Sequence, residues 1–204
     1  MSRIILASKS PRRRELLRLL GFTDFIILPA EGEEAASGAP GDAVRRIALS
    51  KARESLGRFR SEGGDDSALV LAADTLVYLD GAPLGKPADE ADAVSMLRRL
   101  SGKKHFVYTG VALLCRGTER TFFEETAVYF RDMREEEIIG YVKSGEPMDK
   151  AGAYGAQGLG AAFIERIEGD FFNVVGLPVC RLSQELKELG ILPPALSKGV
   201  SGRP

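Results

Sequence analysis

One apolar run with a single carboxylate inside it constrains this chain most strongly. Residues 68–79 are nearly all apolar, and only the adjacent Asp74 and Thr75 interrupt them. Such a run is typical of a buried strand, and Asp80-Gly81 after it is a turn signal. Burying a carboxylate without a partner is energetically expensive, so Asp74 should be paired, metal-bound or facing a cleft at a strand end. Asp74 is therefore the first candidate functional residue, with a paired structural aspartate as the alternative.

The segments around this run mix helical and strand patterns. The patterns predict helices over residues 11–20, 42–56, 89–100, 134–144 and 178–190, and strands over residues 3–7, 25–28, 105–115, 121–131 and 161–167. The stretch 116–119 predicts a long hairpin between two of these strands. Together they indicate an α/β fold with a mixed twisted sheet and flanking helices. We expect one domain over residues 1–192 and a disordered tail over residues 193–204.

Composition excludes several classes of site. The 204 residues include one His and two Cys, which excludes a multi-histidine metal site and a four-thiolate zinc site. The net charge of −1 favours neither nucleic acid nor an anionic membrane as a partner. No apolar run approaches the roughly 20 residues of a membrane span, and sparse cysteines fit a reducing compartment, so we expect a cytoplasmic protein. His105, Cys115 and Cys180 are expected to be structural core residues.

A cationic turn follows the first predicted strand. Ser8-Lys9-Ser10-Pro11-Arg12-Arg13-Arg14 opens the first helix, with Ser10 as the N-cap and Pro11 at the first helical position. A helix start presents free N–H groups, and arginine binds two phosphate oxygens at once. Three cations at a helix N-terminus oppose the helix dipole, so stability alone does not favour them. The turn predicts an anion site that includes Ser8, Arg12 and Arg13, with an exposed basic helix turn as the alternative.

Four further polar residues occupy unusual positions. Lys51 lies on the apolar face of the second predicted helix, so it either snorkels past the core edge or projects into a site. Lys86 is held between Gly85 and Pro87, which suits a fixed phosphate contact or a solvated turn. Gln157 lies in a loop rich in Gly and Ala. Such a loop either allows a ligand to approach its backbone closely or is merely flexible. Glu33, in an early acidic loop, is a candidate metal ligand or a solvated surface residue.

Taken together, these segments resemble the Maf family of nucleoside triphosphate pyrophosphatases. The resemblance covers about residues 3–190 in order. It rests on Leu6-Ala7-Ser8-x-Ser10-Pro11-Arg12-Arg13, Ala73-Asp74-Thr75, Gly85-Lys86-Pro87, Leu100-Ser101-Gly102, Tyr108-Thr109-Gly110-Val111, Asp149-Lys150-Ala151-Gly152-Ala153-Tyr154-Gly155-x-Gln157-Gly158 and Val174-Val175-Gly176-Leu177-Pro178. It implies an inosine-triphosphatase-like fold with a cleft between two lobes, a divalent metal, and a homodimer.

The resemblance also implies roles for individual residues. By position, Asp74 looks like the catalytic carboxylate, and Glu33, Lys51 and Lys86 match polar active-site positions. A further set matches positions associated with base selectivity: Arg12, Thr75 and Gln157. The Ser-Pro-Arg-Arg, Asp-Thr and Tyr-x-x-Gln-Gly patterns are typical of the branch that prefers dTTP and UTP. The Trp and Gln typical of the sister branch, which prefers 7-methyl-GTP, do not stand at the corresponding positions.

These residues suggest one mechanism and leave one alternative function. A triphosphate is strongly anionic, so a set of cations can hold it: Arg12, Arg13, Lys51 and Lys86. Oxygen ligands favour Mg²⁺ or Mn²⁺. We hypothesise that water attacks the α-phosphorus, with Asp74 as base or metal ligand and Glu33 assisting the metal. The alternative function is a nucleotide-binding regulator of septum formation that acts through a partner. A third hypothesis is the same chemistry with a preference for a broad range of bases or for modified pyrimidine nucleotides.

Overall fold

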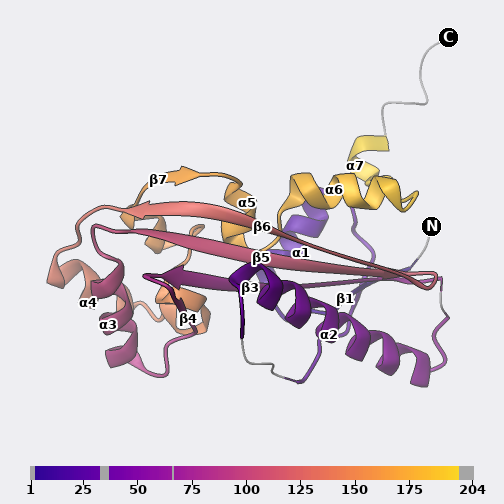
Figure 1. The fold of residues 1–204 in the computed structure, drawn as a ribbon, viewed down its shortest axis with the longest axis horizontal. Coiled ribbons are helices and arrows are strands. Elements are labelled where there is room, and N and C mark those ends of the chain that lie inside the picture. Colours follow the sequence, from indigo (N-terminus) through magenta and orange to yellow (C-terminus); the bar gives the residue numbers. More distant parts are fainter. Residues whose placement is uncertain (1–2, 33–36, 66, 198–204) are drawn as a thin grey trace, which may run out of the picture.

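The protein is described by a computed structural model over residues 3–32, 37–65 and 67–197. Within these residues, seven strands form one mixed sheet in the order β2-β1-β3-β5-β6-β7, with β4 paired to β3 (Figure 1). The strands are β1 (Ile4–Leu6), β2 (Ile26–Ile27), β3 (Leu69–Leu79), β4 (Ala82–Leu84), β5 (Lys104–Cys115), β6 (Thr118–Phe130) and β7 (Ile164–Glu168). Strand β1 runs parallel to β2 and β3, and the other pairings are antiparallel. The predicted mixed α/β fold and its long β5–β6 hairpin are confirmed.

Helices cover the sheet at both ends. The described α-helices are α1 (Pro11–Leu19), α2 (Pro40–Ser61), α3 (Glu90–Leu100), α4 (Glu135–Lys143), α5 (Phe171–Val175), α6 (Val179–Glu188) and α7 (Pro194–Ser197). Three 3₁₀ helices follow α4: η1 (Glu146–Asp149), η2 (Ala151–Ala153) and η3 (Leu159–Phe163). The strand predicted over residues 161–167 begins only at Ile164, because residues 161–163 belong to η3. Helix α2 continues to Ser61, beyond the predicted end, because Phe59 is buried on its inner face. The expected tail over residues 193–204 includes α7, and residues 198–204 lie outside the described residues.

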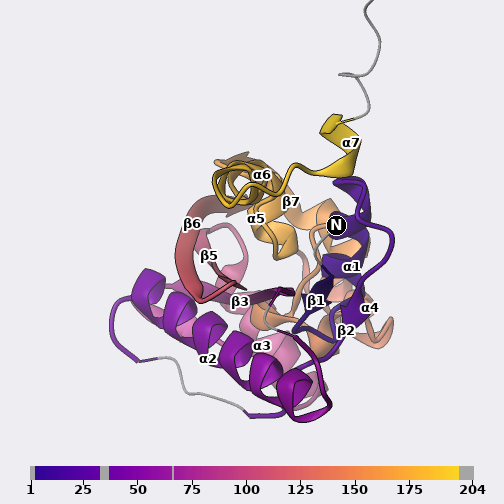
Figure 2. The ribbon, with the colours of Figure 1, turned by 90° about the vertical axis from the view of Figure 1, so that its right-hand side faces the viewer.

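Alternate residues of β3 pack on opposite faces of the sheet. Leu71 and Ala73 contribute to a core with α1 and α6, whereas Val70 and Ala72 contribute to a core with α2. Figure 2 shows α2 on one side of the sheet and α1 and α6 on the other. Strands β3, β5 and β6 continue into a third core built with α3 and α4. We call the part around β1, α1, α2 and α6 the first lobe, and the part around β4, α3, α4 and η1–η3 the second lobe.

One edge of β3 has a gap between two partner strands. β1 pairs with residues 69–71 of β3, and β4 pairs with residues 77–79 on the same edge. Between them, residues 73–76 have no strand partner on that edge within the described chain. The turn after β1 and the Gly85-Lys86 segment after β4 both leave the sheet at this gap, which therefore brings distant polar segments to Asp74 and Thr75.

Two predictions about minor residues have different outcomes. Cys115 is buried as expected, but Cys180 is exposed, so its assignment to the core is wrong. Helix α6 turns Val179, Leu182 and Leu186 inward, and Cys180 falls outside that stripe. No helix in the described ranges is long and apolar enough to cross a membrane.

His105 is a structural core residue, as predicted. Its side chain is fully buried, its Nε2 atom lies 2.8 Å from the Tyr154 hydroxyl, and its ring packs edge-on against Phe130 with centroids 4.9 Å apart. Burial lowers the pKa of His105 to about 4, from an ordinary value of 6.5. The native protein therefore holds this imidazole neutral at physiological pH.

This buried imidazole predicts a pH-dependent stability. Between pH 6.5 and 4 the unfolded chain binds a proton at His105 that the native protein does not. The contribution of neutral His105 to the free energy of unfolding is fully present above pH 6.5. It falls by about 3 kcal/mol on acidification to pH 4. Urea unfolding of the wild type and of His105→Gln across this range measures the effect. The substitution should flatten the pH dependence, and equal slopes for the two proteins would show that His105 does not cause it.

Candidate active site

A cavity of about 530 Å³ opens at the gap in β3. It is lined by every described residue that the sequence predicts as a site residue: Ser8, Arg12, Arg13, Lys51, Asp74, Thr75, Lys86 and Gln157. Glu33, the remaining prediction, lies outside the described residues. The folding of β1, α1, α2, β3 and β4 thus collects side chains that are scattered over the chain into one cavity wall.

Asp74 and Lys51 form an ion pair inside this cavity. Asp74 is on the same face of β3 as Val70 and Ala72, so it points toward α2. The Lys51 Nζ atom lies 2.6 Å from Asp74 Oδ1, with side-chain exposures of 27% and 16%. Lys51 therefore projects into the site, and Asp74 is both paired and turned toward the cleft. The pair leaves the second carboxylate oxygen of Asp74 for a ligand.

Gly110 lets α2 approach close enough for this pair to form. Gly110 is the partner of Asp74 in the β3–β5 ladder. A Cβ atom built on Gly110 would overlap the backbone carbonyl group of Val44 in α2, so only glycine fits here. The helix consequently rests directly on the sheet beside Asp74. Lys51, on the inner face of the same helix, then reaches the carboxylate.

Arg13 ties together three segments on the other face of β3. Its Nη2 group donates to Thr75 Oγ1 at 3.0 Å, its Nη1 group donates to Ser8 Oγ at 3.1 Å, and its Nε group donates to the Gly176 carbonyl at 2.9 Å. Burial lowers the pKa of Arg13, and the nearby Asp74 carboxylate opposes that shift. Each nitrogen of the guanidinium thus has a protein acceptor. Arg13 fixes Ser8 and Thr75 in the cavity wall.

The hydroxyl of Thr75 belongs to a directed chain of hydrogen bonds. Thr75 Oγ1 lies 3.0 Å from Thr109 Oγ1, and Thr109 donates its hydrogen to the Asn173 carbonyl at 2.9 Å. Because that hydrogen is already used, Thr75 donates to Thr109 and accepts from Arg13. Asn173 itself donates to the Val107 carbonyl at 3.0 Å. These buried polar groups fix the rotamer of Thr75.

The second half of α2 holds the loop that leads toward Glu33. A hydroxyl, a guanidinium and a carboxylate group of this helix form hydrogen bonds with the backbone of residues 28–32. Ser55 donates to the Leu28 carbonyl at 2.6 Å, Arg58 to the Pro29 carbonyl at 2.8 Å, and Glu54 accepts from the Glu31 N–H at 2.7 Å and the Gly32 N–H at 3.3 Å. The helix that carries Lys51 therefore also shapes this side of the cavity.

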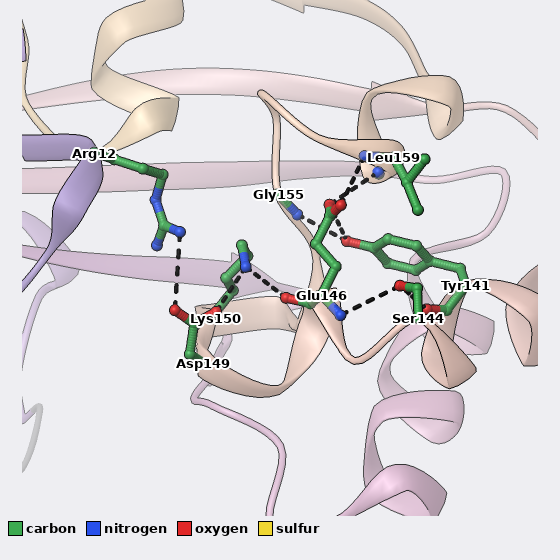
Figure 3. A network of polar contacts seen from close by, with 9 residues as sticks. Arg12, Tyr141, Ser144, Glu146, Asp149, Lys150, Gly155 and Leu159 are labelled. Atoms are coloured by element: carbon green, nitrogen blue, oxygen red, sulfur yellow. Dashed lines mark hydrogen bonds and ion pairs between the residues drawn. The ribbon is translucent and has the colours of Figure 1, made fainter. Parts of the chain in front are cut away.

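The second lobe supplies the opposite wall. Lys86 is exposed and makes no ion pair with a described residue, and the neighbouring Gly85 carbonyl accepts from the Gly152 N–H at 2.9 Å. Gln157 is also exposed, in the turn between η2 and η3. Arg12 of α1 faces Asp149 of η1 across the cleft, with Nη1 and Oδ2 4.0 Å apart (Figure 3). Cations from both lobes thus line the cavity that contains Asp74.

Comparison with known proteins agrees with the family resemblance that the sequence motifs indicate. The family described as Maf-like protein matches residues 3–189, nearly the whole chain. The chain belongs to the Maf family. Curated relatives from Bacillus cereus (strain AH820), Bacillus thuringiensis subsp. konkukian (strain 97-27) and Bacillus anthracis are each 49% identical to it. Each alignment covers 94% of this chain and 97% of the relative, and each relative is named dTTP/UTP pyrophosphatase.

Sequence reasoning missed several polar residues of this Maf-family site. Thr109 and Asn173 are fully buried behind Thr75, and Tyr141 and Glu146 lie behind the loop that carries Gln157. Tyr108-Thr109-Gly110 contributed to the family resemblance, but no chemical role was predicted for Thr109. A buried polar residue that bonds to distant backbone leaves no local signal in the sequence. The Gly-rich loop of this Maf protein was the available clue, since its glycines surround Glu146.

Proposed function

We propose that this chain is a nucleoside triphosphate pyrophosphatase that hydrolyses dTTP and UTP to the monophosphate and pyrophosphate. The observation that carries the proposal is the Lys51–Asp74 pair in a cavity that Arg12 and Lys86 also line. A cavity lined by three cations and a carboxylate suits a triphosphate and a water nucleophile. Membership of the Maf family and the names of relatives that are 49% identical support the substrates.

The proposed reaction is an attack of water on the α-phosphorus. A bond forms between the water oxygen and the α-phosphorus, the α–β bridging bond breaks, and pyrophosphate leaves. Asp74 either takes the proton from the water or holds the metal, while Lys51 fixes its carboxylate. Arg12 and Lys86 bind phosphate oxygens from opposite sides of the cleft. The Ser8 hydroxyl accepts from Arg13 and from the Ser10 N–H, so its own hydrogen is available to a phosphate oxygen.

The donor set fits a Mg²⁺ or Mn²⁺ ion that arrives with the nucleotide. The described residues contain no group of three His, Cys, Asp or Glu side chains that could hold a metal alone. Magnesium in phosphoryl enzymes is typically held by one or two carboxylates together with substrate phosphates and water. Asp74 is the carboxylate that would hold it, and Glu33 is the second candidate. When bound, the ion supplies charge neutralisation at the phosphates.

The proposal also includes a homodimer that acts in the cytoplasm. The homodimer follows from the Maf resemblance. The cytoplasmic location is supported by two cysteines that are free thiols, as is usual in a reducing compartment.

A panel of triphosphates tests this function. The purified protein is incubated with dTTP, UTP, CTP or 7-methyl-GTP in Mg²⁺ or Mn²⁺, and released pyrophosphate is measured. We expect kcat/KM for dTTP and UTP to exceed the values for the other two by about tenfold or more, because a site that hydrogen-bonds one base edge rejects a mismatched edge. Nucleotide binding without release of pyrophosphate would contradict the proposal and favour the regulatory role in septum formation.

A further inference from the structure

The loop that carries Gln157 is wrapped around one carboxylate. Glu146 Oε2 accepts from the Leu159 N–H at 2.8 Å, and Oε1 accepts from the Gly160 N–H at 3.2 Å (Figure 3). The Tyr141 hydroxyl donates to Glu146 Oε1 at 2.9 Å and accepts from the Gly155 N–H at 3.0 Å. Backbone groups on both sides of Gln157 are therefore bonded to these two side chains.

The glycines of this loop are explained by the enclosed side chains. A Cβ atom on Gly158 would overlap the Glu146 carboxylate. On Gly160 it would lie 2.7 Å from the Tyr141 hydroxyl oxygen, and on Gly155 it would lie 3.0 Å from Glu146 Oε1. Real Cβ atoms essentially never make contacts shorter than 3.0 Å, so a side chain at position 158 or 160 would displace Glu146, Tyr141 or the loop itself, and the contact at position 155 is only slightly less tight.

We call Glu146 and Tyr141 the clamp, and the charge states of the two side chains favour strong hydrogen bonds to the loop. Partial burial raises the pKa of Glu146, but the hydrogen bonds from Leu159, Gly160 and Tyr141 outweigh this effect and the net shift is downward. Burial raises the pKa of Tyr141, so its hydroxyl keeps its proton and donates it to Glu146. An ionised carboxylate with three donors is a strong, oriented acceptor.

The clamp is also connected to the cleft through Lys150. The Lys150 ammonium group donates to the Glu146 carbonyl at 2.5 Å and to Asp149 Oδ1 at 2.6 Å. Asp149 in turn faces Arg12 across the cleft. Neither Glu146 nor Tyr141 lines the cavity, whereas Arg12, Lys150 and Gln157 do. The two clamp residues therefore act on the cavity only through other residues.

We propose that Glu146 and Tyr141 are positioning residues that set the base preference by fixing Gln157. Thymine and uracil present an oxygen acceptor where cytosine presents an amino donor, so an amide distinguishes them only if its orientation is fixed. The inference rests on the proposed function for the pyrimidine substrates, and on the family resemblance, together with its place in the cavity wall, for the role of Gln157. It adds that selectivity depends on groups outside the cavity.

The test compares two matched pairs of variants. Tyr141→Phe removes the hydroxyl and keeps the buried ring, which packs against Phe163 at 5.2 Å between centroids. Glu146→Gln weakens the acceptor. Tyr129→Phe and Glu168→Gln are the controls, because Tyr129 donates to Glu168 at 2.8 Å in an exposed pair of the same chemistry on β6 and β7.

The readouts are kcat and KM for dTTP and dCTP, and the dissociation constants of both nucleotides in EDTA. In Tyr141→Phe and Glu146→Gln we expect the preference for dTTP over dCTP to fall about tenfold, through KM and binding, with kcat for dTTP within about twofold of wild type. The controls should keep the wild-type preference. An unchanged preference in folded Tyr141→Phe overturns the inference, even if Glu146→Gln fails to fold.

The binding measurement separates this inference from the proposed function. A wild type that releases no pyrophosphate from dTTP refutes the proposed function, but its binding preference in EDTA is still measurable. A preference that is lost in Tyr141→Phe and kept in Tyr129→Phe supports the clamp in that case too. A wild type that binds dTTP and dCTP equally, or a preference that Tyr141→Phe retains, refutes the clamp.

Discussion

Replacement of Asp74 by Asn is expected to lower kcat for dTTP about a thousandfold. The substitution keeps the shape of the side chain but removes its negative charge. In the wild type, the Lys51 Nζ atom lies 2.6 Å from Oδ1 of this carboxylate. A neutral amide neither takes a proton from water nor binds a divalent ion as a carboxylate does. Loss of a general base or of a metal ligand typically costs two to four orders of magnitude, or about 3–5 kcal/mol of transition-state stabilisation. Pyrophosphate release at saturating dTTP and Mg²⁺ measures the loss.

Asp80→Asn is the matched control for this substitution. Asp80 directly follows β3 and pairs with Lys103 at 2.9 Å, so it forms another aspartate–lysine pair, but both side chains are exposed and lie outside the cavity. Asn tolerates the positive φ of 51° at this position. Turnover should therefore stay at the wild-type level. Near-normal turnover in Asp74→Asn would refute the role of Asp74 in the reaction.

Gly110→Ala is expected to destabilise the protein by about 3 kcal/mol and to reduce activity as well. The added methyl group meets the backbone of Val44, which cannot move away as a flexible side chain can. Relief of the overlap requires α2 to shift from the sheet. Lys51 then moves away from Asp74. Turnover should therefore fall even under conditions in which the variant is fully folded. Urea denaturation and pyrophosphate release measure the two effects separately.

Gly57→Ala provides the comparison on the same helix. A Cβ atom on Gly57 meets nothing within 4 Å, so alanine adds helix propensity without a clash. We expect this variant to be about 0.5–1 kcal/mol more stable than the wild type, with unchanged turnover. If Gly110→Ala were as stable as Gly57→Ala, the close approach of α2 to β5 would not be the reason for glycine at position 110.

Local signals in the sequence were sufficient for the main elements. The apolar run with Asp74 became β3, and Ser10 caps α1 by accepting from the Arg13 N–H at 3.5 Å. The elements that were missed are short or irregular. β4 has three residues and includes Pro83, and α5 has five residues, so neither is long enough for apolar residues to recur at a recognisable spacing. They form because tertiary packing supports them.

The candidate site could be predicted only where a residue contradicts its surroundings. Asp74 stands out in an apolar strand, and Lys51 stands out on an apolar helix face. Glu146 has no such contrast, because Ser144-Gly145-Glu146-Pro147 has the composition of an ordinary turn. Its partners at Leu159 and Gly160 approach it only after the three 3₁₀ helices have formed. Such a contact depends on the path of the chain in space, which residue spacing does not encode.

The three long strands make the cleft a rigid opening rather than a hinge. The β3–β5 ladder runs without a register shift from Val70 to Tyr78, and the β5–β6 ladder runs from Lys104 to Cys115. Both ladders continue from the first lobe into the second (Figure 1). A rotation that opened or closed the lobes would have to bend or break these hydrogen-bonded strands. The width of the cleft is therefore set when the sheet forms, and adaptation to different nucleotides falls to the turns at its rim.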